Sequence, residues 1–183
     1  WDGKCYGGIF SGCEKLEDIS ALENWDVFKV TSMDYIFESC KSLSSVEALS
    51  TWDMSSVISM KYTFARCSKL SDLSYLSDWN VGNVTDMRNL FAGCNSLTSL
   101  DGLNSWNVGM VTNMDYLFSG CTKLGTLEGI SSWNVSNVTR MSHMFNNCKS
   151  VSTLRGLSGW DVSDVKNMDN MFQRCSSLTN LEG

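Results

Sequence analysis

The chain repeats itself every 27 residues, and this period constrains the fold more than any other feature of the sequence. We call the residues that occupy one position in successive units a column. The tryptophan column contains Trp25, Trp52, Trp79, Trp106, Trp133 and Trp160. The phenylalanine column begins at Phe10 and continues through Phe37, Phe64, Phe91, Phe118, Phe145 and Phe172. The cysteine column begins at Cys13 and continues through Cys40, Cys67, Cys94, Cys121, Cys148 and Cys175. An uninterrupted period of this length is typical of a solenoid or a propeller.

Within one unit the apolar residues fall mainly at every third position, as in Leu97, Leu100 and Leu103. Neither an α-helix nor an ordinary strand gives this spacing over a whole unit. The pattern instead predicts a coil of short straight pieces joined by turns around a central core. We expect a short strand over 97–100, an extended or turn segment over 107–114 and a single helical turn over 115–121.

A single unit of this kind cannot fold alone, because both of its flat faces would remain in contact with water. Stacking of neighbouring units is therefore obligatory. We expect one solenoid domain over 1–183, with about six and a half coils. Residues 1–8 fall out of register, and the chain ends in the middle of a unit.

The composition limits the kinds of partner. The 183 residues carry a net charge of −6, which argues against a nucleic-acid surface. No apolar run approaches the roughly 20 residues of a membrane helix, so we expect no membrane insertion by this segment.

His143 and Cys148 lie five residues apart in "WNVSNVTRMSHMFNNCKS" and resemble a catalytic or metal-binding pair. The repeat argues against both, because the other units place no histidine in that column. They have Tyr35, Tyr62, Asn89, Tyr116 and Asn170 there. A site built on this pair would exist in one coil only. The sequence thus predicts no catalytic residue, no metal site, no cofactor and no enzyme activity.

The cysteine column has two interpretations. Disulfides along the stack would need Cα atoms about 4.4–6.8 Å apart, and we place this column on the side where coils splay. Buried free thiols that pack as small hydrophobic groups are the favoured interpretation. Cys5 lies outside the register, and its pairing with Cys13 is a candidate disulfide. Metal binding would need clusters such as C-x-x-C, which the sequence lacks.

A column of short polar residues follows the tryptophans, at Asp26, Asp53, Asn80, Asn107, Asn134 and Asp161. Their oxygens can accept backbone N–H groups at a turn or, stacked as carboxylates, bind a cation. Because half of them are asparagine, turn capping is favoured. The tryptophans themselves are expected to be buried, with a carbohydrate-binding stripe as the alternative.

Units such as "WNVSNVTRMSHMFNNCKSVSTL" resemble the BspA-type leucine-rich repeats, over residues 8–182 and in seven registers. The resemblance implies a leucine-rich-repeat solenoid with short parallel β-strands stacked along the axis and a short helical turn per coil. It also implies a cell-surface or extracellular role in adhesion or partner binding. Thr63, Ile58, Lys166 and Val151 depart from the pattern, without removing a core column.

Two functions fit this reading. The first is a non-enzymatic scaffold that binds a protein or glycan on another cell or matrix, with Tyr35, Tyr62 and Tyr116 as candidate surface residues. The second is a structural spacer or filament element, in which further copies stack head to tail and Leu178 and Leu181 face the next coil. The sequons at Asn83, Asn134 and Asn137 belong to the repeat pattern and would carry glycans only in a eukaryotic secretory pathway.

Overall fold

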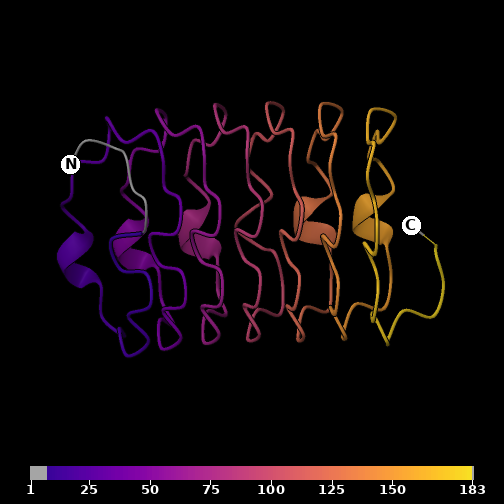
Figure 1. The fold of residues 1–183 in the computed structure, drawn as a ribbon, viewed down its shortest axis with the longest axis horizontal. Coiled ribbons are helices and arrows are strands. Elements are labelled where there is room, and N and C mark those ends of the chain that lie inside the picture. The colour runs from indigo at the N-terminus through magenta and orange to yellow at the C-terminus, as the bar shows by residue number, and fades with distance from the viewer. Residues whose placement is uncertain (1–7, 183) are drawn as a thin grey trace.

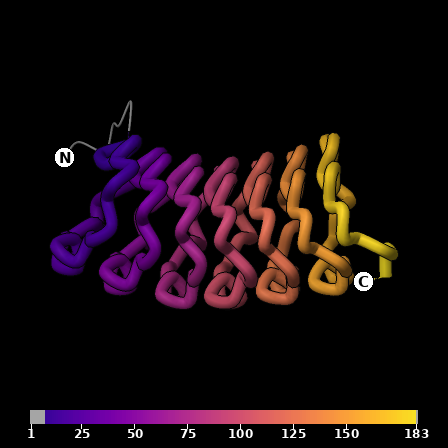
Figure 2. The backbone as a smooth tube through the Cα atoms, turned by 90° about the horizontal axis from the view of Figure 1, so that it is seen from below, coloured from indigo at the N-terminus to yellow at the C-terminus, as the bar shows by residue number. Residues whose placement is uncertain are grey.

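The structure, a computed structural model that describes residues 8–182, is a repeat solenoid. Successive coils lie side by side along the long axis, and residues 8–182 run from one end of the row to the other (Figure 1). The view from below shows the same single row of coils (Figure 2). The predicted repeat solenoid is therefore confirmed.

Neighbouring coils are joined by parallel backbone pairing along one side. Single-residue parallel bridges connect Ser32 to Ser59, and the same column continues through Asp86, Asn113, Arg140 and Asn167. Directly after this column every second N–H group donates to the next coil. In the second coil these donors are Met33, Tyr35, Phe37 and Ser39, with N–O distances of 2.7–2.9 Å. The N–H groups between them close turns within their own coil, as Glu38 does to the Tyr35 carbonyl at 3.1 Å.

Short 3₁₀ helices form a second row, on the opposite part of each unit. They are η1 (Ser20–Leu22), η2 (Glu47–Leu49), η3 (Ser74–Leu76), η4 (Glu128–Ile130) and η5 (Arg155–Leu157). The row is interrupted between η3 and η4 (Figure 1). At this gap Gly102 has φ +94°, and a Cβ there would lie 2.3 Å from the Leu73 carbonyl oxygen. Gly129 and Gly156, at the same position of the next two units, approach the preceding coil as closely, so the positive φ of Gly102 is what distinguishes this unit.

The extended or turn segment expected over 107–114 contains the parallel bridge at Asn113, but the helical turn lies at another position than expected. Residues 115–121 form turns instead of a helix, because Tyr116 and Gly120 have φ +61° and +77°. The parallel bridge of this coil lies at Asn113, and no strand is assigned over 97–100 or elsewhere between residues 8 and 182. The helical turn instead occupies the segment that ends on the inward-facing Leu or Ile, such as Ile130 in η4. Three-residue spacing of apolar side chains therefore reflects successive tight turns, each of which returns a side chain to the core.

The core runs through the middle of the coils. Five phenylalanines from Phe37 to Phe145 are fully buried, and their neighbouring rings stack at centroid distances of 5.6–5.8 Å. Phe172 is partly buried. Four tryptophans from Trp52 to Trp133 are also buried, whereas Trp25 in the first coil is 45% exposed and Trp160 is half-buried. The phenylalanine and tryptophan side chains are thus buried only where a coil has a neighbour on both sides.

Side chains add a second set of bonds between coils. The indole N–H of each tryptophan from Trp52 to Trp160 donates to the carbonyl oxygen 30 residues earlier, at 2.8–3.2 Å. The six thiols from Cys40 to Cys175 lie 3.1–3.3 Å from the phenylalanine carbonyl of the preceding coil. The departure at Thr63 is accommodated in the same way, since its hydroxyl lies 2.9 and 2.8 Å from two methionine carbonyls. The indole, thiol and threonine groups are thereby satisfied across the stack.

The cysteines from Cys40 to Cys175 are buried free thiols. Burial raises the pKa of Cys40 to about 11 and that of Cys121 to about 12, because a thiolate would lose its hydration. Cys13 is exposed, and its predicted pairing with Cys5 lies outside the described residues. A protonated thiol is what donation to a carbonyl requires, so the raised pKa and the hydrogen bond support the same state.

We expect stability to fall at alkaline pH through these thiols. Below pH 9 a thiol such as Cys121 is protonated in both states, whereas between pH 9 and about 12 only the unfolded state ionises. Each such thiol should then cost about 1.4 kcal/mol per pH unit of the free energy of unfolding. Cys121→Ser keeps a hydroxyl donor that does not titrate. Urea unfolding at pH 8 and pH 10 should show the wild type losing more stability than the variant. An equal loss in both would contradict a buried, protonated Cys121.

Candidate functional site

One surface column carries several aromatic residues that lie outside the core. This column, which we call the tyrosine stripe, contains Tyr35, Tyr62, Asn89, Tyr116, His143 and Asn170. All six residues have φ between +57° and +61°. The N–H groups of the first five donate to the next coil, as Tyr62 does to the Arg88 carbonyl at 3.0 Å and Asn89 to the Asp115 carbonyl at 2.9 Å. The stripe is therefore held on the most regular part of the backbone.

The aromatic rings of the stripe form two separate pairs. Tyr35 and Tyr62 stack with centroids 4.8 Å apart and an interplanar angle of 11°. Tyr116 and His143 stack at 4.4 Å and 8°. Asn89 lies between the two pairs in the column and carries no ring. Tyr116 is 38% exposed, so part of its surface is open to a partner.

Charged side chains flank the stripe and neutralise one another locally. Lys61 contacts Asp34 at 2.9 Å, and Arg140 contacts Asp115 at 2.7 Å. The Asp34 carboxylate also accepts the Ser59 hydroxyl at 2.6 Å. The hydrogen bond to Asp34 raises the pKa of Lys61, which stays charged. Partly exposed pairs of this kind contribute little stability, but they fix the polar groups beside the aromatic rings.

His143 and Cys148 do not meet as a catalytic pair. The Cys148 thiol donates to the Phe118 carbonyl of the preceding coil at 3.2 Å, while the His143 ring stacks on Tyr116. The Nδ1 atom of His143 is buried without a hydrogen-bond partner. Among residues 8–182 no group of three or more His, Cys, Asp or Glu side chains could hold a metal ion. The arrangement offers contact surface and no activated nucleophile at this position.

The polar column after the tryptophans caps turns. The Oδ1 atom of each of its six members accepts the N–H two residues later, at 2.9–3.2 Å. Among the sequon residues, Asn83 and Asn137 donate their side-chain amides to Ser55 and Gly109 of the preceding coil. These asparagines therefore have structural partners.

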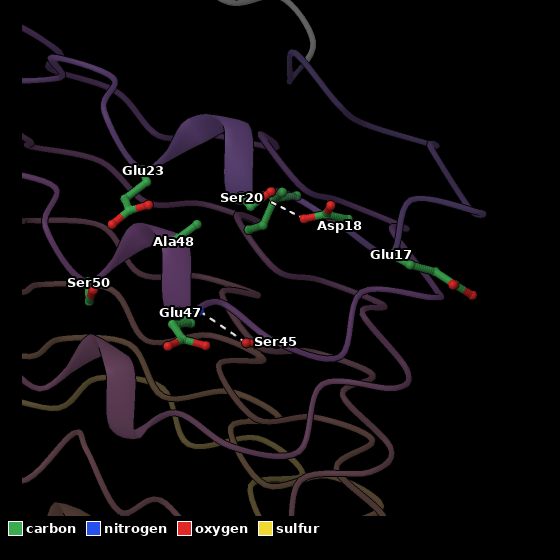
Figure 3. A pocket seen from close by; sticks show the side chains of 9 residues that line it. Glu17, Asp18, Ser20, Glu23, Ser45, Glu47, Ala48 and Ser50 are labelled. Atoms are coloured by element: carbon green, nitrogen blue, oxygen red, sulfur yellow. Dashed lines mark hydrogen bonds between the residues drawn. The ribbon is translucent and has the colours of Figure 1, made fainter.

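A shallow acidic pocket of about 360 Å³ lies beside η1 and η2 (Figure 3). It is lined by Glu17, Asp18, Glu23 and Glu47, among others. Asp18 accepts the Ser20 N–H at 2.8 Å, and its hydrogen bonds with Ser20 lower its pKa. The geometry of the pocket follows from turn capping at the starts of η1 and η2. The tyrosine stripe therefore remains the stronger candidate for a functional site.

Sequence reasoning found the three tyrosines but not the interruption at Asn89 or its neighbour Arg66. The signal for the interruption was present, since asparagine follows each pair of rings in the column, at Asn89 and Asn170. At the C-terminal end, Leu178 is half-buried and Leu181 is 77% exposed. No helix of the described part of the chain is long and apolar enough to cross a membrane.

Comparison with known protein families shows which family the chain belongs to. Residues 6–101 and 97–182 match the family described as "Mycoplasma protein of unknown function, DUF285". The chain belongs to this family. The two matched segments together span nearly the whole repeat array. No curated protein matches the chain.

Two solved structures are similar to the DUF285 chain, with low sequence identity and low TM-scores. One is a leucine-rich cell surface protein from Faecalibacterium prausnitzii, with 16% identity and a TM-score of 0.35, covering 94% of this chain and 67% of that one. The other is a leucine-rich repeat protein from Bacteroides ovatus, with 18% identity and a TM-score of 0.30, covering 93% of this chain and 61% of that one. The chain thus spans less than two thirds of the second structure.

Replacing His143 tests whether the single imidazole has a role. We expect His143→Asn to change the free energy of unfolding by no more than about 1.5 kcal/mol, the value of a stacked aromatic pair. Asparagine already occupies this column at Asn89 and Asn170 with the same positive φ. Thermal melts with and without zinc should give equal midpoints for each protein. A zinc-dependent rise in the wild type alone would contradict this interpretation.

Proposed function

We propose that the protein is a non-enzymatic scaffold of the cell surface or extracellular space, which binds a protein or glycan on another cell or matrix. The observation that carries the proposal is the tyrosine stripe. Core columns repeat the same residue types from coil to coil. The stripe instead presents phenol rings, amides and an imidazole, at positions where core packing does not determine the residue type. Exposed aromatic residues on a rigid frame bind partners with little loss of side-chain entropy.

The sequence resemblance to BspA-type leucine-rich repeats supports a surface location and the leucine-rich-repeat class. The chemistry of the inner columns supports a non-enzymatic role, since their polar atoms are used in bonds between coils. The regular spacing of the stripe supports a partner that is itself extended or repetitive, because each coil offers contacts in the same direction.

A second candidate function is a spacer or filament element built from further copies of the chain. It is supported by the exposed apolar side chains of the terminal coils, which include Phe28 at 53% and Leu181 at 77%. Head-to-tail contact between such faces does not close on itself and gives an open fibre. Sedimentation velocity over a range of concentrations separates the two functions, because a scaffold keeps one sedimentation coefficient while a filament grows.

Removing the rings tests the scaffold directly. The triple variant Tyr35→Asn, Tyr62→Asn, Tyr116→Asn uses a residue that the column already holds at Asn89 and Asn170, so it should fold. We expect the wild type to bind at least one feature on an array of glycans and matrix proteins, and the variant to bind it at least about tenfold more weakly, as for the loss of a hot spot.

The matched control is Tyr75→Asn, which removes an exposed tyrosine from η3 in a different column. This variant should bind as the wild type does. Equal binding by the triple variant and the wild type would contradict a role for the stripe.

A further inference from the structure

The tyrosine stripe contains a gap of one ring. Stacked rings in this column repeat at 4.8 Å for Tyr35 and Tyr62 and at 4.4 Å for Tyr116 and His143. Tyr62 and Tyr116 are two coils apart, so they are separated by about 9–10 Å along the axis, twice the spacing of paired strands. A flat group placed over Asn89 would lie about one stacking distance from each tyrosine.

A cavity lies next to this gap, between the third and fourth coils. It has a volume of about 130 Å³ and is lined by Tyr62, Ala65, Arg66, Asn89, Ala92 and Gly93. The alanines and the glycine leave room where longer side chains would fill the groove. Gly120 follows Gly93 in the next coil, and a Cβ added there would lie 3.6 Å from the Gly93 Cα atom. The strip of backbone without side chains therefore extends into the coil of Tyr116, although Tyr116 does not itself line the cavity.

The polar groups of the cavity distinguish between ring types. The Asn89 backbone N–H is paired with Asp115, but no hydrogen bond of its side-chain amide is recorded within residues 8–182. Arg66 has a side chain that is 67% exposed and a long 3.4 Å contact with Glu38. An amide supplies a donor and an acceptor in one plane, and a guanidinium supplies several donors. A ring with hydroxyl groups on its edge satisfies both, whereas an apolar aromatic ring leaves them without partners.

We infer that this gap, the Asn89 slot, binds a single pyranose ring of a glycan. The apolar C–H faces of the sugar stack between Tyr62 and Tyr116, and its edge hydroxyls bond to the Asn89 amide and to Arg66. This inference rests on the proposed function and names its ligand class, because the slot lies within the tyrosine stripe. Concave sites with aromatic walls and a few fixed polar groups are the usual form of small-ligand sites.

The test uses methyl pyranosides as probes and saturation-transfer NMR as the readout, with the whole chain. Methyl glucoside, galactoside, mannoside and N-acetylglucosaminide are offered separately at millimolar concentration. Asn89→Tyr fills the slot with the residue that Tyr62 and Tyr116 place at φ +58° and +61°, so the fold should tolerate it. We expect at least one pyranoside to show transfer with the wild type and at least a tenfold loss with this variant.

The matched control is Asn170→Tyr, the same substitution in the same column outside the slot, and it should keep the wild-type signal. Asn89→Gly keeps the cavity and the positive φ but removes the amide, so it should weaken the signal without abolishing it. Equal transfer with Asn89→Tyr and wild type, or no transfer from any pyranoside, overturns the inference. Transfer from p-cresol in place of the pyranosides also overturns it, since the slot would then hold an aromatic side chain.

The two proposals fail separately. Array binding that is lost in the triple tyrosine variant but kept in Asn89→Tyr would leave the scaffold function standing and remove the pyranose slot. Array binding that survives both variants would remove the stripe as the binding surface.

Discussion

The contact between neighbouring coils determines what each position in the unit can hold. Backbone N–H groups along one side donate to the next coil, as Phe37 does to Thr63 at 2.9 Å, while the indole and thiol donors reach back to the preceding coil. Both sets require the same offset in every unit, so an insertion of even one residue would break several bonds at once. The constant 27-residue step is the direct expression of this constraint.

The same constraint separates structure from function in the molecule. Columns that face the core or bond between coils hold the same residue types along the chain. Columns that face outward are free to differ, and the tyrosine stripe is where they differ in ring content while the backbone stays the same. Asn89 can therefore interrupt the stack without cost to the fold, since asparagine adopts a positive φ more readily than tyrosine does. A binding surface can evolve one coil at a time on such a frame.

Much of the fold could be predicted from the period alone, including the solenoid and the turn-capping role of the Asp and Asn column. The location of the helical turn could not, because the sequence does not reveal the positive φ of Tyr116 and Gly120, which prevents a helix over 115–121. The thiol donors were also missed. The cysteines were predicted as small hydrophobic groups, and the sequence gives no sign that each thiol lies beside a carbonyl 30 residues earlier. For the candidate site, the tyrosines were visible in the sequence, whereas the cavity beside Asn89 required knowing that Ala92 and Gly93 lie next to Arg66.

The central claim is that stability comes from coils in register, and paired deletions test it most directly. Removal of residues 80–106 takes out one full 27-residue unit and joins Trp79 to Asn107, which restores the unit pattern. Removal of residues 80–92 takes out 13 residues and leaves one coil too short to close. Urea unfolding should show one cooperative transition for the longer deletion, with a smaller m-value because less surface is exposed. The shorter deletion should lose most of its stability or unfold in two steps. Equal stability of the two deletion variants would contradict the account.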